Sequence, residues 1–179
     1  MSKDSLETTR ILPRMCSRVG LEKKVVNVKA KKLLQSKQDI GWVATEYCNP
    51  DDDYIYYFRT DEFRKALTWI QDYFYIDNDK NEEEYMLILW ESGLMKKLFQ
   101  ESMDKLSSFQ KVGCMYHVLI EKKYLDENPM SEKEIEDLLD ISRSTYYTRM
   151  QEAVVAFGLA FCSVAKAYSL EEENTNAEE

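Results

Sequence analysis

The feature that most constrains the fold is a pair of short helical patterns, separated by about three residues, within residues 130–161. Ser131 and, three positions later, Glu134 form a capping box, in which each side chain accepts a hydrogen bond from a backbone N–H at the start of a helix. Ser142 is a favourable N-cap for a second helix. The segment therefore predicts a helix-turn-helix arrangement of two short helices.

Apolar side chains recur at helical spacing in both predicted helices. The first helix places on one face Ile135, Leu138 and Leu139. The second helix places on its inward face Tyr146, Ala153, Val154 and Phe157. The opposite face of the second helix is then polar and available for binding.

A helix that packs in this way presents its first turns to the major groove of DNA, where base edges carry an unambiguous pattern of donors and acceptors. Arg143 can bond a guanine edge or a phosphate, Gln151 an adenine, and Tyr147 a sugar or a thymine methyl group. We expect Arg149 to contact phosphate, and the free N–H groups at the start of the first helix to do the same. The predicted DNA-binding residues are Ser131, Lys133, Ser142, Arg143, Ser144, Thr145, Tyr147, Thr148, Arg149 and Gln151.

A helical hairpin that only completes a hydrophobic core is the alternative interpretation of the same residues. In that case the serines are caps and the tyrosines are packing residues. The outward cluster of Arg, Ser, Tyr, Thr and Gln favours DNA binding, because a merely solvated face typically carries a mixture of Glu and Lys. Acidic residues nevertheless outnumber basic residues between positions 130 and 168, by six to four.

The same segment resembles a known family. Glu134-Ile135, Leu138-Leu139, residues 141–147, Arg149 and Glu152-Ala153 are similar to the C-terminal domain of the ArpU/RinA-like phage transcriptional regulators. That domain is itself similar to region four of bacterial sigma factors. Residues 103–125 of this chain resemble the helix that precedes the domain in the family. The resemblance covers residues 103–168, and it implies double-stranded DNA as the partner and a role in switching phage late genes or host genes beside RNA polymerase.

Charge is distributed unevenly along the chain. The net charge is −9, yet residues 1–37 hold ten Lys or Arg against three Asp or Glu, which gives +7 there and leaves −16 for the rest. A basic arm on an acidic body suits a protein that touches the phosphate backbone at chosen places. It suits equally a protein whose acidic body binds a basic partner, so the charge pattern leaves both interpretations open.

The sequence predicts a mainly α protein, a helical bundle with a small β-hairpin and a C-terminal helix-turn-helix. We expect four consecutive parts. They are a basic N-terminal arm (1–38), an aromatic-rich helical and hairpin region (39–100), the sigma-region-four-like domain (101–169) and an acidic disordered tail (170–179). Residues 25–34 fit either a helix or a strand.

The middle of the chain carries the remaining signals of secondary structure. Aromatic and β-branched residues within residues 42–58, around a turn at 49–51, predict the hairpin. Apolar periodicity then predicts one helix capped by Thr60, one over residues 83–99 and one over 107–125. The aromatic residues of this region either fill a small core or form a surface for self-association or for a protein partner.

No pattern in the chain indicates catalysis or a cofactor. The four cysteines are widely separated, at Cys16, Cys48, Cys114 and Cys162. With His117 as the single histidine, we expect no metal site, no disulfide framework and no nucleophile–histidine–acid arrangement. The longest apolar stretch, residues 153–165, is too short to cross a membrane, and no signal peptide is visible, so we expect a cytoplasmic protein.

Three functions follow, the first two from different classes. The first is a sequence-specific DNA-binding transcriptional regulator, of phage or bacterial type, that reads the major groove with residues 142–165, as a homodimer in which two motifs lie at a fixed separation. The second is a non-enzymatic inhibitor, adaptor or DNA mimic whose acidic surface holds a basic protein. A third is direct contact with an RNA polymerase subunit. A basic face around Arg143 and Arg149 favours the first, and a continuous acidic surface favours the second.

Overall fold

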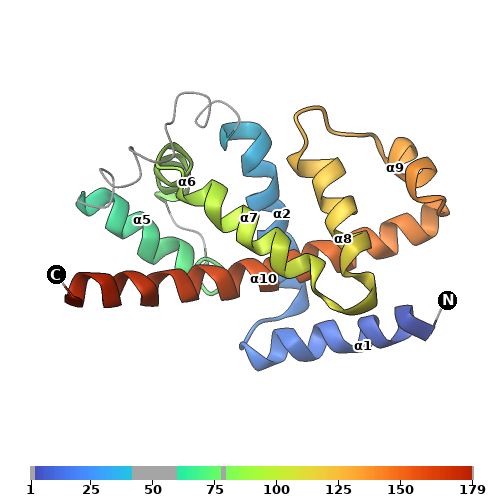
Figure 1. The fold of residues 1–179 in the computed structure, drawn as a ribbon, viewed down its shortest axis with the longest axis horizontal. Coiled ribbons are helices and arrows are strands. Elements are labelled where there is room, and N and C mark those ends of the chain that lie inside the picture. The colour runs from blue at the N-terminus through green and yellow to red at the C-terminus, as the bar shows by residue number, and fades with distance from the viewer. Residues whose placement is uncertain (1–2, 42–59, 78–79, 179) are drawn as a thin grey trace. The chain divides into compact units, whose positions relative to one another are not determined.

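The computed structural model describes residues 3–41, 60–77 and 80–178. Over these ranges the protein is mainly helical, as predicted, and it contains no strand within them (Figure 1). The hairpin predicted for residues 42–58 lies outside the described residues.

The chain forms two compact units, each assembled from segments that are distant in the sequence. The first unit consists of residues 1–35 and 103–160, and the second of residues 36–102 and 161–179. This division cuts across the four consecutive parts expected from the sequence, because the N-terminal segment groups with the C-terminal helices.

The N-terminal segment of the first unit is a pair of helices where we expected a basic arm. Helix α1 spans Lys3–Arg18 and helix α2 spans Lys23–Ser36, with Gly20 between them in the left-handed region at φ 74°. The buried residues of α2 recur every three or four positions, at Val26, Ala30, Leu33 and Leu34. Helical periodicity therefore decides between the two structures that the sequence left open for this segment.

The remainder of the first unit carries the residues predicted to bind DNA. Its elements are the 3₁₀ turn η2 (Gln110–Val112), helix α8 (Gly113–Ile120), the π-helical turn η3 (Glu121–Leu125), helix α9 (Glu132–Leu139) and the beginning of helix α10 (Arg143–Glu178). The single helix predicted over residues 107–125 is thus three helical pieces. A Cβ atom at Gly113 would lie 2.6 Å from the carbonyl oxygens of Leu106 and Ser107, so α8 begins at a position that only glycine fits.

The second unit contains the π-helical turn η1 (Lys37–Gly41), helices α5 (Asp61–Gln71) and α6 (Glu82–Glu91), most of helix α7 (Leu94–Ser107) and the end of α10. Thr60 caps α5, because its hydroxyl accepts a hydrogen bond from the Phe63 N–H at 3.3 Å, as predicted. The single helix predicted over residues 83–99 is wrong. Gly93 adopts φ 82°, the left-handed conformation that ends many helices, and it separates α6 from α7.

Most of the aromatic residues of the described part of the second unit form its core, whereas Tyr75 is 41% exposed. The Trp90 ring packs edge-on against Phe99 at 5.0 Å between centroids, and its indole N–H donates to the buried Ser36 hydroxyl at 3.0 Å. Trp69 packs in the same manner on Tyr73 at 5.2 Å. For these rings the core interpretation holds, and the aromatic residues between positions 42 and 58 lie outside the described residues.

Helix α10 extends further toward the C-terminus than the sequence predicts. It continues to Glu178, where the sequence predicts a disordered tail, and Glu, which is frequent there, is a good helix former. Its residues 143–168 are also long and apolar enough to span a bilayer, yet 78% of the most apolar window is buried inside the protein. That degree of burial is typical of a core helix.

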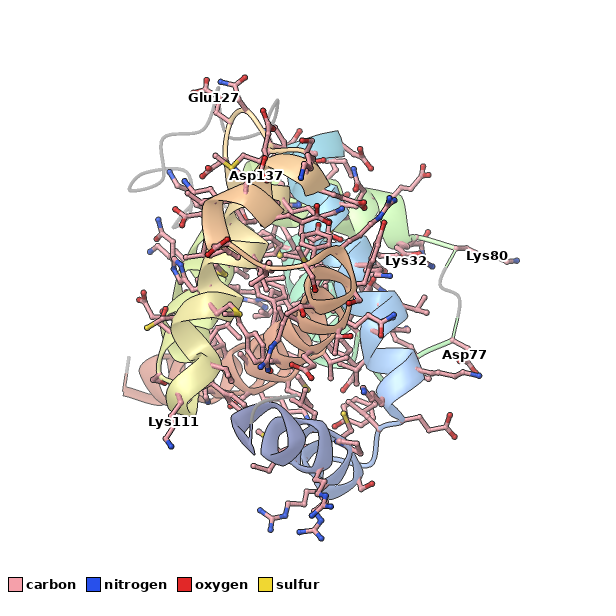
Figure 2. The ribbon with its side chains drawn as sticks, turned by 90° about the vertical axis from the view of Figure 1, so that its right-hand side faces the viewer. Lys32, Asp77, Lys80, Lys111, Glu127 and Asp137 are labelled. Carbon is pink, nitrogen blue, oxygen red and sulfur yellow. The ribbon has the colours of Figure 1, made fainter. Side chains whose placement is uncertain are left out.

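Charged side chains of the first unit lie mostly on its outside. Figure 2 shows Lys32 of α2, Lys111 of η2 and Asp137 of α9 pointing away from the elements that carry them, and all three are exposed. Three charged residues are exceptions, since Glu136 of α9 is only 9% exposed and Arg149 and Glu152 of α10 are 8% and 3% exposed.

Candidate nucleic-acid interface

Helices α9 and α10 are separated by three residues, and side-chain caps define both of their starts. The Glu134 N–H donates to the Ser131 hydroxyl at 3.2 Å, and the Ser131 N–H donates to the Glu134 carboxylate at 2.7 Å, which confirms the predicted capping box. The Ser142 hydroxyl accepts from the Thr145 N–H at 3.2 Å, which confirms the second predicted cap. Asp140 ends α9 in the left-handed conformation, at φ 52°. The chain therefore turns sharply between two well-defined helices.

The inward face of α10 is the predicted one. Its buried residues include Tyr146, Ala153, Val154 and Phe157. In α9 the prediction is only partly right, because Ile135 is buried whereas Leu138 is 53% exposed.

Nine of the ten residues predicted to bind DNA are exposed. They are Ser131, Lys133, Ser142, Arg143, Ser144, Thr145, Tyr147, Thr148 and Gln151. Seven of these lie in the three-residue turn and the first turns of α10, and the other two lie at the start of α9. The beginning of α10 thus carries a polar surface opposite its buried face.

Arg149 is the tenth residue, and the prediction that it contacts phosphate is wrong. Its guanidinium pairs with the Glu152 carboxylate at 3.2 Å, and the Tyr116 hydroxyl of α8 donates to the same carboxylate oxygen at 2.8 Å. The helical spacing carried the signal for this position. Arg149 follows the buried Tyr146 by three residues and precedes the buried Ala153 by four, which puts it on the inward face.

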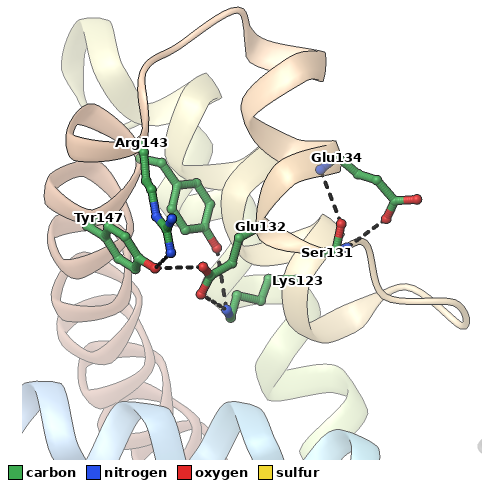
Figure 3. A network of polar contacts seen from close by, with 7 residues as sticks. Lys123, Ser131, Glu132, Glu134, Arg143 and Tyr147 are labelled. Carbon is green, nitrogen blue, oxygen red and sulfur yellow. Dashed lines mark hydrogen bonds and ion pairs between the residues drawn. The ribbon is translucent and has the colours of Figure 1, made fainter.

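A polar network joins the start of α9 to the start of α10 (Figure 3). The Tyr147 hydroxyl donates to Oε2 of Glu132 at 2.7 Å, and Nη2 of Arg143 donates to the Tyr147 hydroxyl at 3.4 Å. The Arg143 guanidinium also lies 5.8 Å from the centre of the Tyr147 ring. The second carboxylate oxygen of Glu132, Oε1, pairs with the Lys123 ammonium of η3 at 3.5 Å. Glu132 therefore connects three elements of the first unit.

Sequence reasoning missed Glu132. Its position in the first turn of α9 is where a carboxylate is favoured by the helix dipole, so the residue looked like part of an ordinary helix start. Its contacts with Tyr147 and Lys123 join residues that are 15 and 9 positions away, which helical periodicity does not reveal.

Hydrogen bonds and neighbouring charges set the ionisation of this network. The hydrogen bond from Tyr147, followed by the charge of Lys123, lowers the pKa of Glu132 although burial opposes the change. The hydrogen bond with Tyr147 also raises the pKa of Arg143. Burial, with the nearby charge of Glu132, raises the pKa of Tyr146 to about 12. These shifts favour an ionised Glu132, a cationic Arg143 and a neutral Tyr146.

The surface of α9 is more acidic than that of the first turns of α10. Glu134, Asp137 and Asp140 are exposed there, and Lys133 forms an exposed ion pair with Asp137 at 3.2 Å. The interface thus combines a polar, cationic helix start with an acidic neighbour. Within the described ranges, no cluster of three or more His, Cys, Asp or Glu side chains has the arrangement of a metal site.

Comparison of the chain with protein-family models, with curated proteins and with solved structures found no match. The resemblance to the ArpU/RinA-like regulators stays a prediction from the residues quoted for it.

Arg149→Ala should lower the free energy of unfolding by about 3–5 kcal/mol in urea denaturation, because it leaves the Glu152 carboxylate buried without its cation. Arg143→Ala, the matched loss of an exposed arginine from the same helix, should leave that free energy nearly unchanged. Equal effects of the two substitutions would contradict the assignment of Arg149 to the core.

Tyr147→Phe should raise the pKa of Glu132 toward the ordinary value for glutamate, because it removes the principal donor to the carboxylate. The measurement is a side-chain carboxyl titration by NMR, with Thr148→Ala as the control that keeps the donor. The network's stabilising contribution is present above the unfolded-state pKa of Glu132 and is lost as the pH falls through the lowered folded-state pKa. An unchanged pKa in Tyr147→Phe would mean that the hydrogen bond does not form in solution.

Proposed function

We propose that the protein is a sequence-specific, double-stranded DNA-binding regulator of transcription, with α9 and α10 as a helix-turn-helix. The observation that carries the proposal is the set of exposed polar side chains on the first turns of α10, whose opposite face is buried. A helix anchored on one face and polar on the other at its N-terminal end has the form of a recognition helix.

The exposed side chains fall into two adjacent rows. Arg143, Tyr147 and Gln151 recur every four residues along one line of the helix, and Ser144 and Thr148 form the neighbouring line. From residue 143 to residue 151 the helix rises about 12 Å, which is comparable to the width of the major groove of B-DNA. In this proposal Arg143 reads guanine, Gln151 reads adenine, and Tyr147 contacts a sugar or a thymine methyl group.

The start of α9 is proposed to position the motif on the phosphate backbone. The first N–H groups of a helix have no partners within it, and the helix dipole favours an anion there. Ser131 and Lys133 are both exposed at this end, and the Glu132 carboxylate between them is directed to Tyr147 and Lys123 instead of to the helix start. Contacts of this kind fix orientation and carry no sequence information.

The second candidate function is the binding of a basic partner protein, and the acidic side chains around α9 favour it. Glu132 lies between Arg143 and Lys123 in the network, and the exposed acids of α9 extend the negative charge of a chain whose net charge is −9. In this alternative the acidic side of α9 holds a cationic polypeptide. The homodimer, the contact with RNA polymerase and the cytoplasmic location are further parts of the proposal.

The test is fluorescence anisotropy of the purified protein with labelled duplex fragments of its own locus, over a series of salt concentrations. We expect saturable binding to one fragment, which weakens as salt rises because counterions are released. The double variant Arg143→Ala/Tyr147→Ala should bind that fragment at least about tenfold more weakly, since a good base contact is worth about 1–3 kcal/mol.

The matched control is Lys32→Ala, which removes one exposed positive charge from α2 (Figure 2). Its affinity should stay within about threefold of the wild type, as a general loss of charge is a small, sequence-independent effect. Circular dichroism of each variant checks that the helices are retained. If no fragment binds even at low salt, the proposal fails and the basic-partner alternative takes its place.

A further inference from the structure

We infer that Glu132 determines specificity in this interface by disfavouring phosphate contacts at Arg143 and Tyr147 while permitting contacts to base edges. The inference rests on the proposed function and names a residue that the proposed reading surface does not include. It begins from the network in Figure 3, where a carboxylate lies beside the two side chains best suited to read bases.

The contacts hold Arg143 and Tyr147 as one unit. The phenolic proton of Tyr147 is donated to Glu132 at 2.7 Å, so its oxygen is left to accept from Arg143 at 3.4 Å. Two side chains with many rotamers are thereby arranged before any ligand arrives, which reduces the entropy that binding must otherwise offset. Because an arginine has five N–H donors, this contact leaves others available for a ligand.

The charge of Glu132 separates two kinds of ligand atom. A phosphate that approaches Arg143 brings a full negative charge toward the Glu132 carboxylate, and the two repel each other. A base edge carries only partial charges, so it is bonded by Arg143 with much weaker repulsion. The carboxylate therefore weakens contacts to DNA phosphates more than contacts to base edges in the groove. An unfavourable interaction that acts on one kind of contact creates specificity.

The effect requires that Glu132 keep its charge beside Lys123 and Arg143. Lys123 pairs with one oxygen of Glu132 at 3.5 Å, and the hydrogen bond from Tyr147 engages the other. Since both partners favour the ionised carboxylate, and the pKa of Glu132 is lowered, the negative charge persists at neutral pH. A substitution that keeps the shape and removes this charge measures its contribution together with that of the ion pair to Lys123.

Glu132→Gln is that substitution, because an amide oxygen still accepts from Tyr147. The experiment measures dissociation constants for the bound locus fragment and for an unrelated duplex of the same length, at several salt concentrations. We expect the unrelated duplex to bind about tenfold more tightly than it does to the wild type at low salt, with a salt dependence steeper by about one phosphate contact. The locus fragment should gain less, so the ratio of the two affinities should fall by at least about threefold.

Glu127→Gln is the matched control. It removes the same charge by the same chemical change from the exposed segment before α9 (Figure 2), and it should alter both affinities by less than about twofold. If Glu132→Gln strengthens both duplexes by the same factor, or neither, the inference is overturned while the proposed function stands. If neither the wild type nor Glu132→Gln binds any duplex at low salt, the proposed function itself has failed.

Discussion

The buried pair of Arg149 and Glu152, completed by the Tyr116 hydroxyl, is the interaction on which the geometry of the candidate interface depends. Breaking such a pair leaves a charge without a partner in a dry environment, which costs several kcal/mol. The pair therefore restricts rotation of α10 about its axis relative to α8. Once Arg149 faces inward, the helical repeat brings Arg143, Tyr147 and Gln151 to the outside.

The two sides of α10 differ in how firmly their polar groups are held. On the inner side the carboxylate of Glu152 is nearly inaccessible, and it receives two donors at short distances. On the outer side Glu132, Tyr147 and Arg143 interact at the surface, where water and salt compete with every contact. The inner side therefore supplies a scaffold that keeps its shape, while the outer contacts order Arg143 and Tyr147 at the surface where a ligand can reach them.

The local chemistry of α9 and α10 could be predicted from the sequence, because caps and apolar spacing act over three or four residues. Ser131, Glu134 and Ser142 are examples, and so is the stripe that begins at Tyr146. Glu132 could not be recognised, since its role depends on Lys123 and Tyr147, which the fold brings near it. Arg149 was misassigned because its charge was given more weight than its position between two buried residues.

Competing sequence features also explain the predictions that were wrong elsewhere in the chain. Gly93 ends α6 because it adopts a left-handed conformation. An isolated glycine within an apolar pattern does not by itself predict the end of a helix. The basic residues of the N-terminal segment suggested an arm, and their charge obscured the apolar spacing of Val26, Ala30 and Leu33. In both places the sequence contained the signal, and a competing feature outweighed it.

The claim that the beginning of α10 contacts DNA is tested most directly by NMR, with backbone amide shifts recorded while the locus fragment is added to labelled protein. The account predicts that the largest shift changes fall within residues 131–133 and 142–151, with the Glu132 amide among them. Changes confined to α1 and α2, or to the exposed acids that follow Lys133 in α9, would contradict it.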